Sequence, residues 1–388
     1  MRANRKLRAT PLPINSFKDL GTTVEADYAI IGGGVVGLSI AWGLLKRGKR
    51  VVVVDGEDGS FRASRGNFGL IWVQSKGLTQ PRYAEWCQQS AAAWRDFADE
   101  LADATGRGIG LEQDGGYDFH FTEESLEKTV AGYNKLKVKL GGNYPFEVLG
   151  RNALRKEEPD IGPTIVGAIL HHQDGHVNPL RVLQALAQDV RQMGGKVLTG
   201  KTVTAVSKRE LFVARCSDGT QVQSEKVVLS AGLGAAELGS QMGFLAPVAP
   251  LRGQNIITEK MPRFINRPSL YARQVNEGGV QIGFSAEKVG PDDSVTVETI
   301  SSIAVKAIEI YPKIAKAQIV RTWGALRIMS PDGLPIYQES KDIPGAFLVT
   351  CHSGVSLAAV HARFLPHWLE ATNNAPDLEV FSEDRFAI

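Results

Sequence analysis

The sequence of 388 residues predicts an α/β protein of two domains, one built on parallel strands and one mostly antiparallel α+β domain inserted into it. Three observations lead to this prediction. Two short, continuously apolar segments flank a glycine-rich loop near the N-terminus, as in a parallel sheet covered on both faces. The chain is longer than a single undivided core usually allows. Later segments alternate apolar and polar residues, as half-buried antiparallel strands do.

The first element is a βαβ unit. Residues 26–31 form a short apolar strand, residues 35–48 follow as a helix with apolar periodicity, and residues 50–55 form a second buried strand. A crossover of this kind between parallel strands is right-handed by default. The unit therefore predicts the start of a doubly wound sheet.

The loop between the first strand and the helix has the spacing of a dinucleotide-binding turn. Gly32, Gly34 and Gly37 supply a tight turn, a close backbone approach to pyrophosphate and close packing of the helix on the strand. The helix N-terminus then faces the phosphates. Asp55 ends the second strand, where an acid that binds ribose is expected. The loop alone does not separate FAD from NAD.

The rest of the chain divides between the two domains. We expect a helix at 179–194, a strand at 196–198, a hairpin of 202–208 with 211–216, and a buried strand at 226–230. Strands at 254–258 and 279–284 and a helix at 299–311 belong to the inserted domain. The predicted boundaries are an N-terminal extension at 1–24, the first domain at 25–108, 148–246 and 324–388, and the inserted domain at 109–147 and 247–323.

Composition excludes several classes of function. The formal charge of +2, with scattered basic residues, argues against nucleic-acid binding. No run approaches the roughly 20 apolar residues of a spanning helix, and no secretory signal is present, so we expect a cytoplasmic protein that reaches a membrane only through partners. The three cysteines form no C-x-x-C pair, and a polar turn interrupts His171, His172 and His176, so no metal site is predicted. The basic residues of the first segment indicate either a disordered leader or a docking arm.

Several later motifs, in order along the chain, resemble the D-amino-acid oxidase or glycine oxidase family of flavoproteins. The resemblance extends from Asp27 nearly to the C-terminus. It implies a Rossmann-type FAD-binding domain of the GR2-like kind and an inserted substrate domain. The motifs are Ala63-Ser64, Asn67 and Gly69; Val203 and Val206; Val227 to Gly232; Arg252 to Gln254; Trp323 to Arg327; Pro331 to Pro335; and Cys351 to Val355.

Two stretches, 67–77 and 351–359, are most similar to the catalytic subunits of opine oxidases, hydroxyproline dehydrogenases and hydrogen cyanide synthase. This similarity implies a hetero-oligomer whose other redox subunits carry FMN or iron–sulfur centres, and a substrate with an amine beside a carboxylate. The chain has Ala325 in the segment where monomeric sarcosine oxidases attach FAD through a cysteine, so we expect non-covalent FAD. It also passes directly from His352 to Ser353-Gly354, where glycine oxidases carry extra residues, so the pocket wall should differ.

The resemblance supplies candidate site residues. Arg327 is expected to hold the substrate carboxylate and Tyr271 to add a hydroxyl, with a structural ion pair and a core aromatic as the respective alternatives. His352 either packs beside the isoalloxazine or only orients its loop. Backbone N–H groups of Ser353, Gly354 and Val355, at the start of a helix expected over 355–370, would meet the N1–C2=O edge of the flavin. The cofactor-binding residues are predicted to be Gly32, Gly34, Val35, Val36, Gly37, Asp55, Ser64, Asn67, Gly69, Leu70, Val203, Ala231, Gly232, Arg327, Ser353, Gly354, Val355 and Ser356.

These residues predict an FAD-dependent dehydrogenase or oxidase that takes a hydride from an N-substituted or D-configured, opine-like amino acid onto flavin N5. A dehydrogenase of D-hydroxyproline, glycine or another D-amino acid is the nearest alternative. A flavin-binding scaffold that only passes electrons between partners is the alternative of another class.

Overall fold

The computed structural model describes residues 23–56 and 62–386, and the basic N-terminal leader lies outside them. Its largest sheet has eight strands in the order β16-β17-β11-β1-β2-β8, with β10 and β9 continuing from β11. The strands are β1 Thr23–Ile31, β2 Val51–Val54, β8 Lys196–Leu198, β9 Val203–Lys208, β10 Phe212–Cys216, β11 Gln221–Leu229, β16 Ile336–Glu339 and β17 Ala346–Thr350.

The centre of this sheet is parallel, as predicted. β1 lies between β2 and β11, and β8 and β17 extend the parallel pairing on either side. Alternate residues of β1 enter two different cores: Ile30 packs on one face and Ile31 on the other. Both faces are covered, which explains why the strand is continuously apolar. The predicted βαβ unit is therefore confirmed, with α1 at Val35–Lys46.

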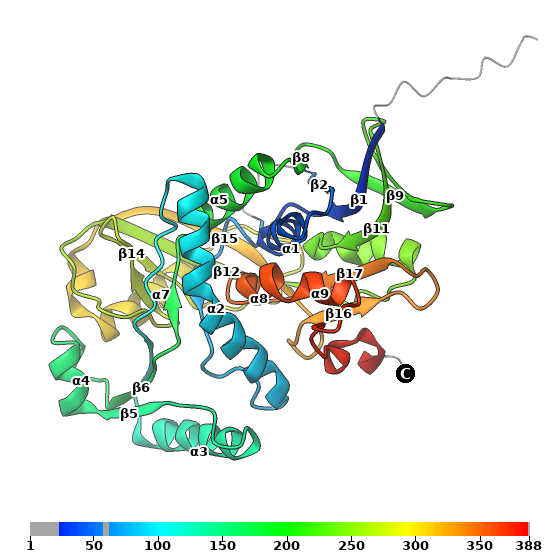
Figure 1. The fold of residues 1–388 in the computed structure, drawn as a ribbon. Helices are drawn as coiled ribbons and strands as arrows, with labels where there is room; N and C mark the ends of the chain where they lie inside the picture. Colours follow the sequence, from blue (N-terminus) through cyan, green and yellow to red (C-terminus); the bar gives the residue numbers. More distant parts are fainter. Residues whose placement is uncertain (1–22, 57–61, 387–388) are drawn as a thin grey trace, which may run out of the picture.

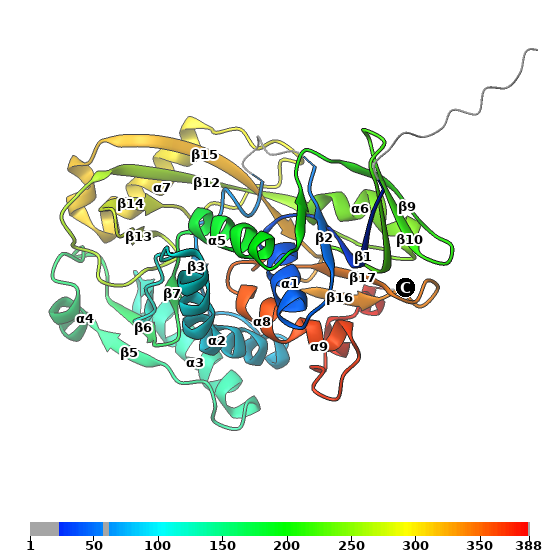
Figure 2. The same cartoon turned by 45° about the horizontal axis from the view of Figure 1, so that its top comes forward.

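Helices cover one face of the sheet and a β-meander covers part of the other. α1 packs against α5 (Pro179–Gln192), α8 (Ala358–Arg363) and α9 (Leu365–Leu369), and α2 (Pro81–Thr105) packs against α5 and α8. Figure 2 shows α5, α1 and α8 in this layer. On the other side, β9 and β10 form the predicted hairpin, and β10 pairs with β11. Helices therefore bury one face of β1 and β2, and strands bury part of the other.

Two antiparallel sheets lie beside this unit (Figure 1). One has the order β13-β14-β12-β15 and the other β4-β6-β5. They share one hydrophobic core with α7, separate from the two cores of the large sheet. The elements are β12 Ala249–Lys260, β13 Ala272–Gln274, β14 Gly279–Ile282, β15 Ile319–Met329, α7 Val297–Ile310, β4 Gly116–His120, β5 Glu147–Gly150, β6 Gly167–His171, α3 Glu123–Lys139 and α4 Arg151–Glu157.

The domain boundaries stay predictions, and two of them fall inside elements of these sheets. The boundary at residues 147/148 lies within β5, and the boundary at 323/324 lies within β15. β15 pairs with β12 from Ile319 to Met329. The predicted boundary at 323/324 therefore divides a strand that belongs to one sheet along its whole length.

The structure corrects the helix predicted over 355–370. Residues 352–357 form hydrogen-bonded turns, and two short helices, α8 and α9, follow with a break at Phe364. Pro366 in the first turn of α9 has no N–H to continue the ladder from α8. The predicted helix was therefore wrong in both its start and its continuity.

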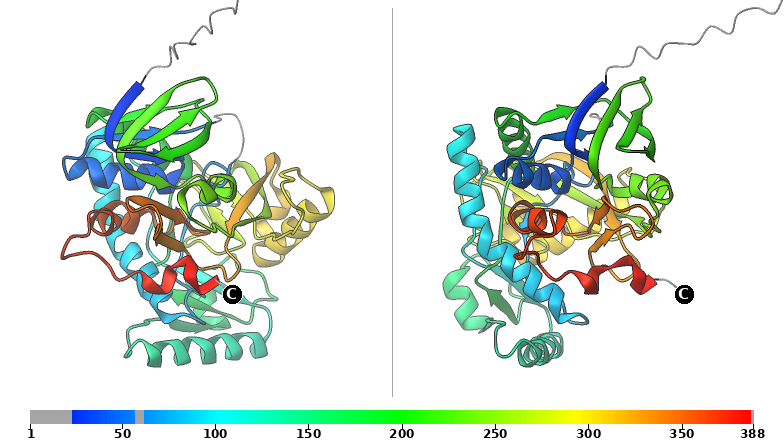
Figure 3. Two further views of the ribbon diagram at one scale, coloured as in Figure 1. Left: turned by 90° about the vertical axis from the view of Figure 1, so that its right-hand side faces the viewer. Right: turned by 45° about the vertical axis from the view of Figure 1, so that its right-hand side comes forward.

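A second difference is α3, which no predicted element covers. Thr122 caps it by accepting a hydrogen bond from the Ser125 N–H at 3.2 Å. Acidic residues occupy its first turn and lysines its last, in keeping with the helix dipole. Figure 3 shows α3 at the end of the molecule remote from the β9–β10 hairpin. Within residues 23–56 and 62–386, no helix has both the length and the apolar character needed to cross a membrane.

Candidate functional site

A cavity of about 920 Å³ lies at the carboxyl ends of β1, β2 and β11. This edge is where open parallel sheets bind their ligands, and the volume is at the upper end of the range for cofactor sites. Eight of the predicted cofactor residues line the cavity: Gly32, Gly34, Val36, Asp55, Ser64, Val203, Ala231 and Gly232. The structure thus gathers residues from four distant segments at one surface.

The glycines of the loop are required by close backbone contacts. Gly32 has φ of 114°, and a Cβ there would lie 2.4 Å from the Ser230 carbonyl oxygen. A Cβ on Gly37 would lie 2.0 Å from the Gly32 carbonyl oxygen. Helix α1 can therefore approach the loop and β11 only with glycine at these positions.

The start of α1 faces the cavity. Gly34 is its N-cap and offers no side chain, and the Val35 N–H donates to Ser64 Oγ at 3.0 Å. Asp55, at the end of β2, lines the cavity and forms an ion pair with Arg62 at 2.8 Å. A hydroxyl and a paired carboxylate thus flank the N-terminus of α1, which suits a phosphate-bearing ligand with a ribose.

Loop residues 67–70 are fixed beside the C-terminal turn. The Gly69 N–H donates to Asn67 Oδ1 at 2.7 Å, and Leu70 begins β3, Leu70–Ile71, which pairs with β7, Gly175–His176. Ser356 Oγ donates to the Leu70 carbonyl at 3.0 Å and accepts from the Trp72 N–H at 3.1 Å. One hydroxyl therefore joins two segments that both carry predicted cofactor residues.

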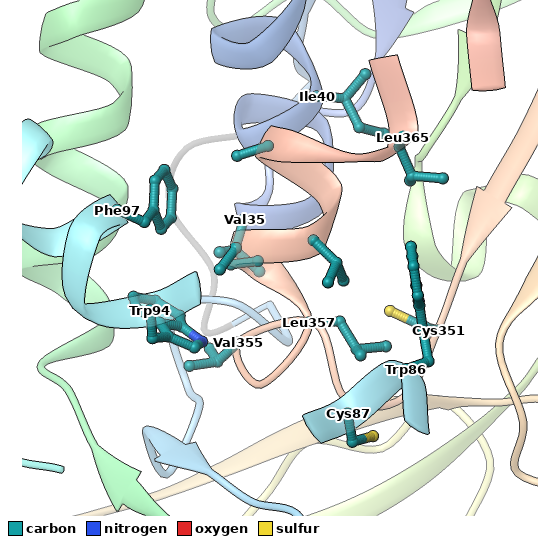
Figure 4. Packing of buried hydrophobic residues seen from close by; sticks show 14 of the residues in the cluster. Val35, Ile40, Trp86, Cys87, Trp94, Phe97, Cys351, Val355, Leu357 and Leu365 are labelled. Carbon is teal, nitrogen blue, oxygen red and sulfur yellow. The ribbon is translucent and has the colours of Figure 1, made fainter. Parts of the chain in front are cut away.

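The C-terminal turn packs directly on the glycine loop. A Cβ on Gly354 would come within 3.1 Å of the Val35 side chain and 3.2 Å of Val36. Figure 4 shows Val355 and Leu357 in the apolar cluster that also holds Val35 and Trp94. The first N–H groups of this segment that donate to a backbone carbonyl are those of Leu357 and Ala358. The N–H groups of residues 353–355 therefore have no backbone acceptor among the described residues.

Arg327 lies on β15 between Leu326 and Ile328, both of which line the cavity, although Arg327 itself is not among the lining residues. Its Nη1 donates to the Ser285 carbonyl at 2.7 Å, and the guanidinium lies over Gly253, where a Cβ would be 2.6 Å away. Burial lowers the pKa of Arg327, but guanidinium remains protonated in proteins. No carboxylate of the described residues forms an ion pair with it, so the structure does not support the structural ion pair considered for Arg327.

Tyr271 occupies a different place. Its ring packs edge-on against Phe121 and Phe284, with ring centroids 6.4 Å and 5.1 Å apart. It lines a separate groove of about 470 Å³ along α7, and it is not among the residues that line the large cavity. The contact of Tyr271 with substrate therefore stays a prediction.

His352 follows Cys351, which lines the cavity, and is partly buried. Burial lowers its pKa to about 3, and the positive charges of Lys76 and Arg327 act in the same direction. The imidazole is therefore neutral near pH 7 and cannot serve as a cation there.

Comparison with known proteins agrees with this geometry. Residues 27–368 match the family DAO, FAD dependent oxidoreductase. This chain belongs to that family. It is 39% identical over 363 residues to an opine oxidase subunit of Agrobacterium tumefaciens (strain Ach5), covering 93% of this chain and 98% of that protein. Hydrogen cyanide synthase subunit HcnC of Pseudomonas aeruginosa is 28% identical over 408 residues, covering 93% of this chain and 96% of that protein.

Solved structures confirm the predicted fold class of this DAO-family chain. Glycine oxidase from Geobacillus kaustophilus superposes with a TM-score of 0.86 at 26% identity, covering 92% of this chain and 98% of that one. The family identifies the cofactor as FAD, and the cavity fits it. Because the loop is made of glycines, it presents backbone atoms and no side chains to the cavity. The cavity extends from Val203 past this loop to Cys351. The chain is thus an FAD-dependent oxidoreductase.

Two polar residues near this site were not selected from the sequence. Lys76 lies within the motif at 67–77, and its Nζ donates to Ser353 Oγ at 3.0 Å. Asp174 is buried, and it accepts hydrogen bonds from the Val73 N–H at 2.5 Å and the Gln74 side-chain amide at 2.9 Å. Burial raises the pKa of Asp174 to about 8. The only available signal for Lys76 was a charged residue in an otherwise uncharged motif, and no local pattern marks Asp174.

Proposed function

We propose that this chain is the catalytic subunit of a hetero-oligomeric dehydrogenase that oxidises the C–N bond of an N-substituted or D-configured, opine-like amino acid. The observation that carries the proposal is Arg327. The residue lies between Leu326 and Ile328, which line the FAD cavity, and its guanidinium has two backbone acceptors on Nη1 and no carboxylate partner among the described residues. A buried cation of this kind is costly unless a ligand satisfies it. A substrate carboxylate fits its planar fork.

The chemistry asks little of the protein beyond positioning. Bound FAD supplies the hydride acceptor, N5 of the isoalloxazine. Arg327 would hold the carboxylate so that the neighbouring C–H bond is oriented. Neutral His352 could donate one hydrogen bond, and the N–H groups of Gly354 and Val355, which have no backbone acceptor among the described residues, could stabilise negative charge that develops on the cofactor. No side chain of this set needs to exchange a proton for the C–H bond to break.

The relatives support the substrate class and the assembly. The opine oxidase relative, at 39% identity over nearly the full length, is named both for a substrate and as one subunit of a complex. Partner subunits with FMN or iron–sulfur centres would carry electrons onward, because the described residues hold no cluster of His, Cys, Asp and Glu suited to a metal. D-Hydroxyproline, glycine or another D-amino acid is the alternative substrate.

Anaerobic mixing of the FAD-loaded chain with a panel of opines, D-proline derivatives and glycine tests the proposal. A dehydrogenase must bleach its flavin absorption with at least one of these amines. The most efficient substrate, ranked by the bleaching rate at low concentration, identifies the class. If none bleaches the flavin while FAD stays bound, the chain is a flavin-binding scaffold instead.

A further inference from the structure

The motif Arg252-Gly253-Gln254 lies in β12, between β14 and β15, and its two faces contact different parts of the molecule. Side chains of consecutive strand residues point to opposite faces of a sheet. Arg252 and Gln254 therefore share one face, and Gly253 belongs to the other, together with Arg327 on β15. The strand register agrees, because Arg327 pairs with Leu251, two residues before Gly253.

On the face of Gly253, the guanidinium of Arg327 crosses β12. A Cβ on Gly253 would lie 2.6 Å from Cζ, Nη1 and Nη2 of Arg327. Arg327 Nη1 donates to the carbonyl of Ser285, which follows β14 on the far side of β12, at 2.7 Å. The guanidinium thus occupies the space that any side chain at position 253 would take.

On the opposite face, Arg252 holds residues 285–296, the segment between β14 and α7. The Arg252 side chain is buried, and its guanidinium donates to Glu287 at 2.9 Å and 3.3 Å and to Asp292 at 2.5 Å. Nη1 also donates to the Ser294 hydroxyl at 3.1 Å. Charge-assisted hydrogen bonds of this kind are the strong ones in proteins. Arg252 therefore ties both halves of the segment to β12.

Ser285 connects the two faces of the motif. Its hydroxyl accepts the Gln254 N–H at 2.7 Å, and its carbonyl accepts Arg327 Nη1. Glu287, two residues later, exchanges two backbone hydrogen bonds with Arg252, each at 3.0 Å, in addition to the ion pair. The place of the Ser285 carbonyl, and with it the place of the Arg327 guanidinium, thus depends on how firmly β12 holds Ser285 and Glu287.

We propose that Arg252 is a positioning residue for Arg327: by holding Glu287 and Asp292 it fixes the Ser285 carbonyl, and thereby the guanidinium that binds the substrate carboxylate. This inference rests on the proposed function and deepens it by giving the motif a role in carboxylate recognition. Arg252 does not contact the substrate, because its side chain lies on the face away from the Arg327 guanidinium. A misplacement of about 1 Å can lower a rate by about 100-fold, so a loosened segment has a measurable effect.

Pairs of an acid and its carboxamide test this role. Each amine of the panel that bleaches the flavin is compared with its carboxamide by the rate of anaerobic bleaching at low concentration. (Methylthio)acetate and (methylthio)acetamide lack the amine, and their Kd values are measured from the shift of the flavin absorption spectrum. The native chain should favour the acid of each pair. Arg252→Met should lower this preference by about 10- to 100-fold, while the amides are little changed.

Three further variants show whether Arg252 acts through Arg327. In an Arg327→Met background, Arg252→Met should have no additional effect on the preference, because residues that act through one partner are not additive. Gly253→Ala should fold, since the three atoms nearest to its Cβ are the end of the flexible Arg327 side chain, and it should lower the preference as Arg327→Met does. Arg252→Lys should recover only part of the preference, because an ammonium lacks the planar fork that meets two carboxylates.

Arg267→Met is the matched control. Arg267 lies between β12 and β13 and forms an ion pair with Glu157 at 2.6 Å, and its described hydrogen bonds all go to residues outside 285–296. The control should leave the preference for the acid unchanged. If Arg252→Met does not load FAD, Glu287→Gln takes its place with the same expected loss, because it keeps the shape of the side chain and removes the charge.

The outcomes separate this inference from the proposed function. An unchanged preference in Arg252→Met, or equal binding of acid and amide by the native chain, overturns the positioning role. So does an equal loss for acid and amide, which would show that Arg252 only stabilises the fold, or an additive loss in the double variant, which would show that its effect does not pass through Arg327. Flavin bleaching by amines would persist in the native chain in each of these cases. Absence of bleaching by every amine tested instead overturns the proposed function, and the thioether pair still decides the role of Arg252.

Discussion

Replacement of Arg327 by methionine should abolish recognition of the substrate carboxylate while FAD stays bound. Methionine keeps the apolar stem of the side chain but removes the guanidinium fork. The protein itself loses only the Nη1 bond to the Ser285 carbonyl at 2.7 Å and a longer one to Arg252, so the cost in stability should be about 1–3 kcal/mol. The variant should therefore fold.

The effect on catalysis should be much larger than the effect on folding. Loss of one partner of a hydrogen-bonded charge pair costs about 2–5 kcal/mol. This corresponds to roughly thirty- to several-thousand-fold in kcat/KM. Arg327→Lys should recover only part of the loss, because an ammonium cannot match both carboxylate oxygens in one plane.

The assay is anaerobic flavin bleaching at low substrate concentration, with the acid and its carboxamide compared in native protein, Arg327→Met and the exposed control Arg107→Met. The native chain and the control should prefer the acid strongly. In Arg327→Met the acid and the amide should react at similar rates. If the substitution lowered both rates by the same factor with FAD retained, Arg327 would be structural and the assignment of the carboxylate site would be refuted.

Four further predictions follow from the structure. Acid or heat treatment should release intact FAD into the supernatant, because Ala325 offers no thiol and burial raises the pKa of the Cys351 thiol to about 12; flavin remaining in the pellet would contradict this. Gly37→Ala should lose FAD, since its Cβ would lie 2.0 Å from the Gly32 carbonyl, whereas Gly132→Ala on α3 should keep it; the ratio of absorbance at 450 and 280 nm measures both. Asp174 has a raised pKa of about 8, so the folded state keeps a proton that the unfolded state releases above about pH 4, and the free energy of unfolding falls as the pH rises from about 4 to about 8. In urea melts, Asp174→Asn should make this fall with pH less steep. If the pH dependence were the same in the variant, Asp174 would be ionised in the folded protein. Turnover with the physiological acceptor should require partner subunits, and full activity of the isolated chain would refute the proposed electron route.

Much of the FAD-binding half could be predicted because its signals are local. β1, α1 and β2 follow one another within residues 23–54, and their apolar pattern and glycine spacing reflect contacts made inside the same unit. The β9–β10 hairpin is likewise a local structure with a short connection. The signals of α3 were also local, with a threonine cap and charges arranged along the dipole, so its omission was an error of interpretation.

The positions of Tyr271 and of the C-terminal turn depended on packing that the sequence does not reveal. Tyr271 packs against Phe121, which follows β4, and Phe284, which comes just after β14, instead of lining the large cavity. The helix expected over 355–370 starts only at Ala358, after a turn in which Ser356 makes hydrogen bonds to Leu70 and Trp72. Local propensity does not include either contact.

The sequence by itself determined the dinucleotide loop, the parallel sheet and, through motifs in order along the chain, the family and its cofactor. These depend on short-range spacing, where the geometry of strand and helix relates residue number directly to position. Only the tertiary structure decided which charges share the site. Lys76 and Ser353 are separated by 277 residues, and they meet because Ser356 ties the loop that follows β1 and β2 to the C-terminal turn. Contacts of this kind arise from the packing of complete elements, so they can be recognised only after the neighbouring side chains have been placed.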